Sequence, residues 1–210
     1  MKRPLITAKG SLIAFTLCTF FASNTYAFEE LGSIDLGPAE APALPVAGTK
    51  KFFIQDDEEQ MVTVTEVTDT HIAYLSADGC SWESPLHDFD FTATGNWNNC
   101  SGSSGTKKIK AKGSMFPLQS GSKASYSIKG EVTKGAWTGK WNNKRKCKVS
   151  GAVRIKTATG EHDTWKVVCK PNDDKRTMYY SPELGTRVVH IRKHYKNSTR
   201  SFHSELLRVE

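Results

Sequence analysis

The sequence predicts an all-β protein, folded as a curved antiparallel sheet or meander, half-barrel or sandwich-like, with two disulfides and little helix. Residues 146–157 alternate between apolar and charged or small polar side chains, the period of a half-buried strand. Gly and Ser recur throughout the chain, and no segment has convincing helical periodicity. Four cysteines follow the N-terminal segment, an even number that favours disulfides.

The N-terminal segment has the pattern of a cleaved signal peptide. Lys2 and Arg3 give a positive start, an uncharged apolar run covers residues 11–22, and small residues lead to Ala27. The apolar run is too short for a mature membrane helix, although a retained anchor helix is the alternative. We therefore expect an exported protein, in the periplasm or outside the cell, with no transmembrane span after signal cleavage.

We expect three parts along the chain. Residues 1–27 form the signal peptide. Residues 28–49 are rich in Ala, Pro, Gly and acidic side chains, a composition typical of a flexible tether. Residues 50–210 form the β domain, divided by charge into an acidic part at 50–100 and a basic part at 101–210.

The first strands of the β domain are expected at residues 61–67 and 71–75, which are rich in β-branched and apolar side chains. Residues 146–157 form the clearest strand, with a turn at 158–160 leading into its hairpin partner. That hairpin places Cys147 opposite Cys169 on the core-facing side. A Cys147–Cys169 disulfide follows, which leaves Cys80 with Cys100.

Three more strands are expected near the C-terminus, at residues 176–181, 186–195 and 201–209. Pro182 presets the backbone for a turn between the first two, and Gly185 can adopt positive φ there. Asn197-Ser198-Thr199 supplies the last turn. An antiparallel meander is the architecture that these spacings favour.

Two blocks near the C-terminus carry a resemblance to a family. They are Gly160-Glu161-His162-Asp163-Thr164-Trp165-Lys166-Val167-Val168-Cys169 and Arg176-Thr177-Met178-Tyr179-Tyr180-Ser181-Pro182-Glu183-Leu184-Gly185. This ending resembles that of a family of exported bacterial β-domains, distantly similar to the TapB-like class of envelope proteins. Cys80-Ser81-Trp82 and Trp97-Asn98-Asn99-Cys100 extend the resemblance over residues 78–209, while His162 replaces the usual aromatic residue. The resemblance implies a curved antiparallel sheet and an envelope location, and it supplies no catalytic residue.

Charge is distributed unevenly along the chain. Residues 28–100 contain 2 Lys and 14 Asp or Glu, a formal charge of −12, whereas residues 101–210 contain 24 Lys or Arg and 8 acidic residues, a formal charge of +16. Basic side chains alternate along the predicted strands, and Arg187, His190, Arg192 and His194 are expected to extend the same surface. The candidate anion-binding residues are Lys108, Lys110, Lys112, Lys146, Lys148, Arg154, Lys156, Lys166, Lys170, Arg187 and Arg192.

Three interpretations of this basic surface remain open. The lysines can form a solvated face that discourages edge pairing. The acidic part of the chain can pack against them. The surface can bind an anion such as lipopolysaccharide, anionic lipid or polyanionic glycan. Nucleic acid is the least favoured ligand, because export separates the chain from the genome and no aromatic-rich recognition motif is present.

The sequence contains no convincing catalytic motif, and it predicts neither a cofactor nor a metal site. His87-Asp88 with Asp90, and His162-Asp163, lack the spacing of metal ligands. Tryptophans could line a sugar-binding groove, although core packing is commoner in a β protein of this size. They are Trp82, Trp97, Trp137, Trp141 and Trp165.

We therefore expect a periplasmic or secreted, non-catalytic binding or structural module, whose basic face engages an anionic envelope lipid or glycan. One alternative is an envelope-polymer hydrolase acting through Asp88, Asp90 or a histidine. Another is a subunit of a cell-surface assembly, with an envelope protein as its partner.

Overall fold

The computed structural model describes residues 28–86 and 88–210. The predicted signal peptide (1–27) and His87 lie outside the described residues. Thirteen strands and one 3-10 turn make up the secondary structure of the described chain. They are β1 (Glu29–Ser33), β2 (Lys50–Gln55), β3 (Glu58–Val67), β4 (His71–Ser76), β5 (Ser81–Pro85), β6 (Trp97–Cys100), β7 (Ser103–Lys112), β8 (Lys123–Lys134), β9 (Trp137–Thr157), β10 (Gly160–Lys170), β11 (Asp174–Ser181), β12 (Thr186–His194), η1 (Ser198–Arg200) and β13 (Phe202–Val209).

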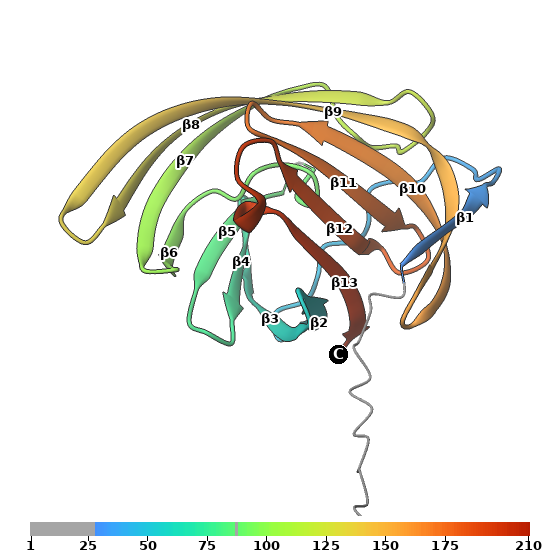
Figure 1. Cartoon of the computed structure of the whole chain (residues 1–210), viewed down its shortest axis with the longest axis horizontal. Helices are drawn as coiled ribbons and strands as arrows, with labels where there is room; N and C mark the ends of the chain where they lie inside the picture. The colour runs from blue at the N-terminus through green and yellow to red at the C-terminus, as the bar shows by residue number, and fades with distance from the viewer. Residues whose placement is uncertain (1–27, 87) are drawn as a thin grey trace, which may run out of the picture.

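The strands form one antiparallel sheet that closes on itself (Figure 1). Strand β13 pairs with β2, and β8 pairs with β9, so the strands from β2 to β13 make a closed barrel of twelve. Strand β1 adds to β9 as an extra member. The predicted all-β antiparallel fold is confirmed. The sequence was compatible with a half-barrel or a sandwich, and the structure shows that the sheet closes into a barrel.

Strand β9 is the longest strand and pairs with two neighbours, β8 and β10. Its residues 137–148 pair with β8, and its residues 146–157 pair with β10. The β8–β9 hairpin therefore continues beyond the start of the β9–β10 pairing, and it projects at one side of the molecule (Figure 1). The predicted strand at 146–157 is the second half of this longer element.

Both predicted disulfides are confirmed. Cys147 lies directly opposite Cys169 in the register of β9 and β10, and the two are bonded. Cys80 is bonded to Cys100 and thereby links the start of β5 to the end of β6. The first bridge lies in the hydrophobic core, whereas the second lies at a half-buried position.

The predicted C-terminal strands correspond to β11, β12 and β13. The first turn, at residues 182–185, has Gly185 at φ 60°. Strand β12 contains a register shift, because Tyr179 pairs with Val189 whereas Tyr180 pairs with Arg187. The extra residue is Val188, and this β-bulge changes which side chains of β12 face inward.

The main hydrophobic core includes two connections that pack against strand residues. Phe91 from the β5–β6 connection and Met115 from the β7–β8 connection are fully buried. Asp88 holds the two connections together, because it accepts hydrogen bonds from Tyr126 Oη at 2.6 Å and from the Met115 backbone N–H at 3.1 Å. The two connections thus help to fill the main core of the described chain.

Residues 28–49, the predicted tether, contact the sheet at several points. Strand β1 pairs with β9, and Ala39 exchanges backbone hydrogen bonds of 3.0 and 2.7 Å with Leu118. Ala39 is buried in the main core. Among the described residues, no helix has the length and apolar character needed to cross a membrane.

Candidate functional site

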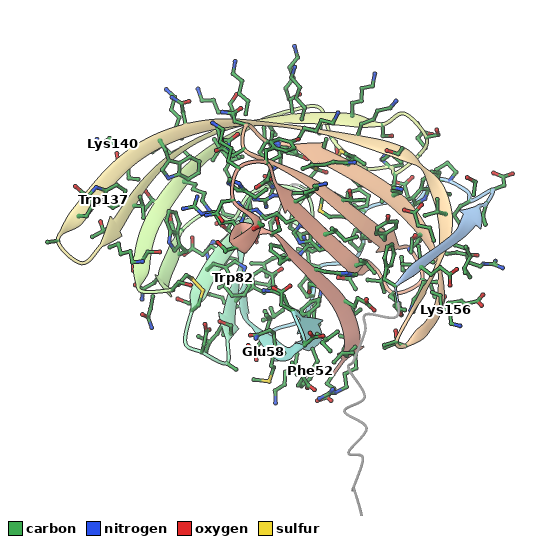
Figure 2. The ribbon with its side chains drawn as sticks, in the orientation of Figure 1. Phe52, Glu58, Trp82, Trp137, Lys140 and Lys156 are labelled. Atoms are coloured by element: carbon green, nitrogen blue, oxygen red, sulfur yellow. A yellow bond between two sulfur atoms is a disulfide. The ribbon has the colours of Figure 1, made fainter. Side chains whose placement is uncertain are left out.

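The outer surface of β7, β8, β9 and β10 carries a grid of lysines, which we call the outer lysine face (Figure 2). Six of the predicted anion-binding residues belong to it, and four other exposed lysines extend it. Its members are Lys108, Lys110, Lys112, Lys123, Lys129, Lys140, Lys144, Lys146, Lys148 and Lys170.

Several lysines of this face are directly opposed. Lys108 pairs with Lys129, Lys123 with Lys148, and Lys146 with Lys170. Like charges in such positions repel one another and destabilise the sheet. One acidic side chain offsets part of this charge, since Glu131 forms an ion pair with Lys140 at 3.0 Å. The outer lysine face therefore has a strong positive field.

The remaining predicted cations on β9 and β10 have acidic neighbours. Arg154 forms a two-bonded ion pair with Asp163, at 2.7 and 3.1 Å. Lys166 Nζ lies 2.6 Å from Glu30 Oε1. Lys156 lies between Glu29 and Glu161 in the register. These three cations are less available to an external anion than the outer lysine face is.

Four residues of β12 lie inside the molecule: Arg187, His190, Arg192 and His194. The expectation that they extend the outer basic surface was therefore wrong. They line a cavity of about 850 Å³. The β-bulge in β12 explains part of the difference. In a regular strand Arg187 and His190 would face opposite sides, whereas the extra residue Val188 brings both to the cavity side.

The cavity wall has more positive than negative side chains. Seven Lys or Arg and three Asp line it, a formal excess of four positive charges with histidine neutral. The cations are Lys51, Lys107, Arg145, Arg176, Arg187, Arg192 and Arg200; the carboxylates are Asp90, Asp173 and Asp174. Buried charge normally requires a partner, so the local arrangement of these groups decides what the cavity can bind.

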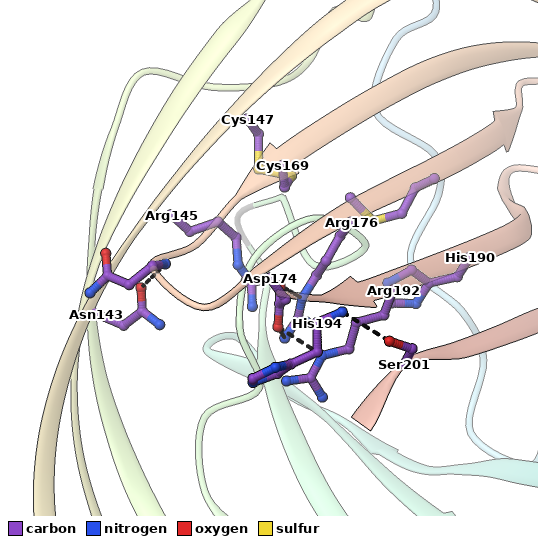
Figure 3. Close-up of polar contacts among 12 residues, drawn as sticks. Asn143, Arg145, Cys147, Cys169, Asp174, Arg176, His190, Arg192, His194 and Ser201 are labelled. Atoms are coloured by element: carbon purple, nitrogen blue, oxygen red, sulfur yellow. Dashed lines mark hydrogen bonds and ion pairs between the residues drawn. A yellow bond between two sulfur atoms is a disulfide. The ribbon is translucent and has the colours of Figure 1, made fainter. Parts of the chain in front are cut away.

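Asp174 is neutralised by two arginines at the cavity wall (Figure 3). Its oxygens lie 3.0 Å from Arg176 Nε and 2.7 Å from Arg192 Nε. Burial acts to raise the pKa of Asp174, but the hydrogen bonds and charges of the two arginines outweigh it and hold that pKa below its ordinary value. This carboxylate is therefore ionised and already shared between two cations.

Lys107, Arg145 and Arg176 form what we call the inner cation cluster. Burial, followed by the charges of Arg145 and Arg176, lowers the pKa of Lys107 to about 8. Burial, followed by the charge of Arg176, also lowers the pKa of Arg145 to about 9. The two cations are thus held in a site that disfavours their charged forms.

Neutral groups supply the direct contacts of Lys107 and Arg145, whereas Arg176 is paired with Asp174. Arg145 Nη1 donates a hydrogen bond of 3.0 Å to the Phe91 carbonyl. Lys107 Nζ donates one of 2.5 Å to Thr94 Oγ1 and lies 4.5 Å from the centroid of the Trp97 ring. A cation–π contact offsets only a small part of the cost of burying a charge. The cluster therefore favours the arrival of an anion.

Several buried polar atoms around the cavity have no hydrogen-bond partner within the described part of the chain. They are Arg145 Nε, Asp90 Oδ2, Thr92 Oγ1 and His190 Nε2. Leaving such groups unpaired costs about 1–3 kcal/mol each. Both donors and acceptors are among them, so a polar ligand with more than one functional group would satisfy this wall.

Asp90 belongs to a second charged group in the cavity. Its Oδ1 lies 3.7 Å from Arg187 Nε, and burial raises its pKa despite the charges of Arg187 and Lys51. Lys51 Nζ donates a 2.8 Å hydrogen bond to Thr186 Oγ1. Burial, followed by Arg187 and other arginines, lowers the pKa of His190 well below its ordinary value, so this imidazole is neutral.

The other residues proposed for catalysis are placed differently. Asp88 is a structural carboxylate between two connections. His162 lies near the β9–β10 turn, 3.1 Å from Thr159 Oγ1, and its neighbour Asp163 is paired with Arg154. No group of three or more His, Cys, Asp or Glu among the described residues could hold a metal ion.

Two tryptophans cover glycines on the neighbouring strands of the sheet. Trp97 is paired with Gly105, and Trp141 is paired with Gly130. A Cβ added to Gly105 or Gly130 would lie 2.2–2.5 Å from its nearest neighbours, which include the indole rings. The Gly-x-Trp-Asn-Asn segments at 95–99 and 139–143 thus place their tryptophans in equivalent cross-strand positions.

The remaining tryptophans separate into core and surface. Trp165 is buried in the main core. Trp82 stacks with Tyr74 at 5.4 Å and lines the cavity. Trp137 is 60% exposed near the tip of the β8–β9 hairpin (Figure 2), and a Cβ added to Gly139 would lie 2.4 Å from its ring. Core packing therefore accounts for Trp165, whereas Trp82, Trp137 and Trp141 are accessible to a ligand.

Sequence reasoning missed the inner cation cluster, although part of the signal was present. Arg145 has the same parity in β9 as Cys147, which was assigned to the inward face. Lys107 has the same parity in β7 as Ile109, which alternates with the outer lysines. An inward cation at either position indicates a buried polar site. Arg176 lies at the start of the predicted strand 176–181, and the local sequence does not indicate that its side chain faces a cavity.

Comparisons with known proteins give no family for this chain. No family model matches it, and no curated protein matches it. A solved structure with some similarity is the hypothetical lipoprotein YmcC from Escherichia coli (K12), at 9% sequence identity and a TM-score of 0.46. The alignment covers 79% of this chain and 90% of that protein. The resemblance of the C-terminal blocks to TapB-like proteins stays a prediction.

Proposed function

We propose that this chain is a non-catalytic binding protein of a cell envelope or extracellular space, which holds an anionic ligand inside its closed sheet. The observation that carries the proposal is the inner cation cluster. Arg145 is only 6% exposed, its Nε lacks a partner among the described residues, and Lys107 and Arg176 add charge of the same sign. An anion there would remove repulsion and supply charge-assisted hydrogen bonds.

The size and lining of the cavity support this function. Its volume of about 850 Å³ lies within the range of small-molecule sites. Asp174 is already shared by two arginines, so it does not neutralise Lys107 or Arg145 by direct contact. The two disulfides support an oxidising compartment, as expected of an exported protein.

Calorimetric titration of the purified protein with citrate and with inorganic sulfate tests the proposal. Lys107→Gln and Lys108→Gln form a matched pair, because each removes one positive charge from β7, inside and outside the cavity respectively. We expect Lys107→Gln to weaken anion binding about five- to tenfold, and Lys108→Gln to change it less than about twofold. Equal weakening by both variants, or no binding of either anion to the wild type, contradicts the proposal.

A second candidate function belongs to the outer lysine face. Its directly opposed lysine pairs support binding to a surface with closely spaced negative charges, an anionic envelope lipid or glycan. We expect the protein to sediment with phosphatidylglycerol vesicles or adsorb to a polyuronate resin at low salt, and to be released at high salt. Lys110→Glu with Lys146→Glu should abolish this retention. Retention unchanged in that double variant contradicts the role of this face.

A further inference from the structure

A row of side chains leads along β9 from the hairpin tip into the cavity. Trp137, Trp141 and Arg145 are four residues apart, and the β8–β9 pairing is regular over this length. They therefore lie on one side of the strand, roughly 13 Å apart in succession. Trp141 and Arg145 line the cavity, and Trp137 lies beyond it near the tip. The arrangement matches an elongated ligand better than a compact ion.

The indole rings on this row are flat platforms. Trp141 covers Gly130 and Trp137 covers Gly139, because in both positions a Cβ would lie about 2.4–2.5 Å from the ring. Each ring thus occupies the space that a side chain at the glycine would fill. Trp137 is 60% exposed and Trp141 is half-buried at the cavity wall, so part of each ring remains accessible. Flat aromatic surfaces fixed over glycines are suited to stacking against rings of a ligand.

Neutral hydrogen-bonding side chains make up much of the cavity wall beside the charged groups. They are Gln55, Gln60, Ser76, Ser84, Thr92, Thr94, Asn143, Thr186 and Ser204. Amide and hydroxyl groups of this kind both donate and accept hydrogen bonds, so they can pair with the hydroxyls of a sugar. A hydrocarbon chain would offer these groups no hydrogen bond, and the buried Thr92 Oγ1, which has no partner among the described residues, would stay unsatisfied at a cost.

We propose that the ligand is an acidic oligosaccharide, whose carboxylate or other anionic group binds the inner cation cluster while its sugar rings stack on Trp141 and Trp137. This inference rests on the proposed function and specifies the class of its ligand. Arg145 and Lys107 supply the charge recognition, and the neutral wall binds hydroxyls. The hairpin tip extends the site outside the cavity, so an oligomer gains contacts that a single sugar does not reach.

Tryptophan fluorescence titration compares four probes: citrate, galacturonic acid, its linear hexamer, and a neutral galactose hexamer. We expect the galacturonate hexamer to bind at least about tenfold more tightly than the monomer and the neutral hexamer. Trp137→Ala should lower the ratio of hexamer to citrate affinity about fivefold. Tyr195→Ala is the matched control, because Tyr195 is 56% exposed and is not among the residues that line the cavity.

The outcomes separate this inference from the function on which it rests. If citrate binds but the acidic hexamer binds no better than its monomer, the oligosaccharide is contradicted and the anion site stands. If Trp137→Ala lowers hexamer and citrate affinity equally, the platform is contradicted. A thymidine hexanucleotide that binds more tightly than the acidic hexamer also overturns the inference, in favour of stacked bases. If no anion binds, the proposed function itself fails.

Discussion

Lys107 shares a cavity wall with Arg145, whose guanidinium adds its repulsion to the effect of burial and brings the pKa of the Lys107 ammonium down to about 8. Neighbouring Lys108 is exposed on the other side of the same strand. Two adjacent lysines of β7 thus have different energetic roles. One adds to a solvated grid, and the other holds a charge that the folded chain disfavours in the absence of a ligand.

Replacing Lys107 should therefore stabilise the ligand-free protein. The pKa is about 8 in the folded chain and 10.5 in its ordinary state, so the unfolded chain binds this proton more tightly. Stability of the wild type should rise with pH between about 8 and 10, and the full penalty is present below pH 8. We expect Lys107→Met to gain about 1–3 kcal/mol at pH 7, measured by urea unfolding.

Lys108→Met is the control for that measurement, since Lys108 lies outside the cavity. It should change stability by less than about 0.5 kcal/mol. Between about pH 8 and 10, the free energy of unfolding of Lys107→Met should also increase less with pH than that of the wild type. A loss of stability in Lys107→Met at pH 7 would show that the ammonium has a compensating partner, and would remove the energetic argument for the anion site.

Asp174 gives the opposite expectation. Asp174→Asn leaves Arg176 and Arg192 without their shared carboxylate. We expect a loss of about 2–4 kcal/mol in the free energy of unfolding, since removing one partner of a buried ion pair leaves uncompensated charge. The variant should also gain affinity for citrate, because the cavity becomes more positive. Thermal unfolding with and without citrate measures both effects.

Asp163→Asn is the matched control for Asp174→Asn. The Asp163–Arg154 pair is exposed, with 42% and 48% of the side-chain surfaces accessible. Exposed pairs contribute about 0–1 kcal/mol, so this loss should be small. If the two variants lose the same stability, or if Asp174→Asn binds citrate more weakly, then Asp174 does not limit the positive charge available to a ligand.

Gly130→Ala tests the platform under Trp141. A Cβ at Gly130 would lie 2.5 Å from the indole ring, so the ring has to move. We expect a loss of about 1–3 kcal/mol by overpacking, together with a change in tryptophan emission. Gly95→Ala is the comparison, because its Cβ would meet Glu83 O at 3.6 Å, an ordinary contact. Equal effects would show that the Trp141 ring is free to shift.

The strands were predictable where one face of the sequence is apolar. Cys147, Val149 and Cys169 alternate with charges, so their strand, its hairpin and the disulfide could be predicted from the pattern. Strands β6 to β8 were not assigned, because Gly105 and Gly130 occupy inward positions where an apolar side chain would have marked the face. Their apolar surface comes from Trp97 and Trp141 on the paired strands, which no local window contains.

Closure of the sheet and the interior site depend on non-local geometry. The pairing of β13 with β2 joins residues about as far apart as the β domain allows, and local periodicity carries no information on it. The bulge at Val188 decides that Arg187 and His190 both face the cavity. Regular alternation would put them on opposite faces, and the expectation that they extend one outer surface was wrong about the side. The sequence could therefore identify cations on β12 but not the cavity that they share.

The two disulfides should differ in accessibility and in their effect on the fold. Cys147 and Cys169 are 3% and 0% exposed in the core, whereas Cys80 and Cys100 are half-buried. We expect mild reductant to open the Cys80–Cys100 bridge first, because a thiolate has to reach the sulfur that it attacks. Replacing Cys147 and Cys169 by Ala should cost about 2–5 kcal/mol. Alkylation followed by peptide mass analysis identifies the order of reduction, and prior opening of Cys147–Cys169 would mean that the core near the inner cation cluster opens more readily than the β5–β6 connection.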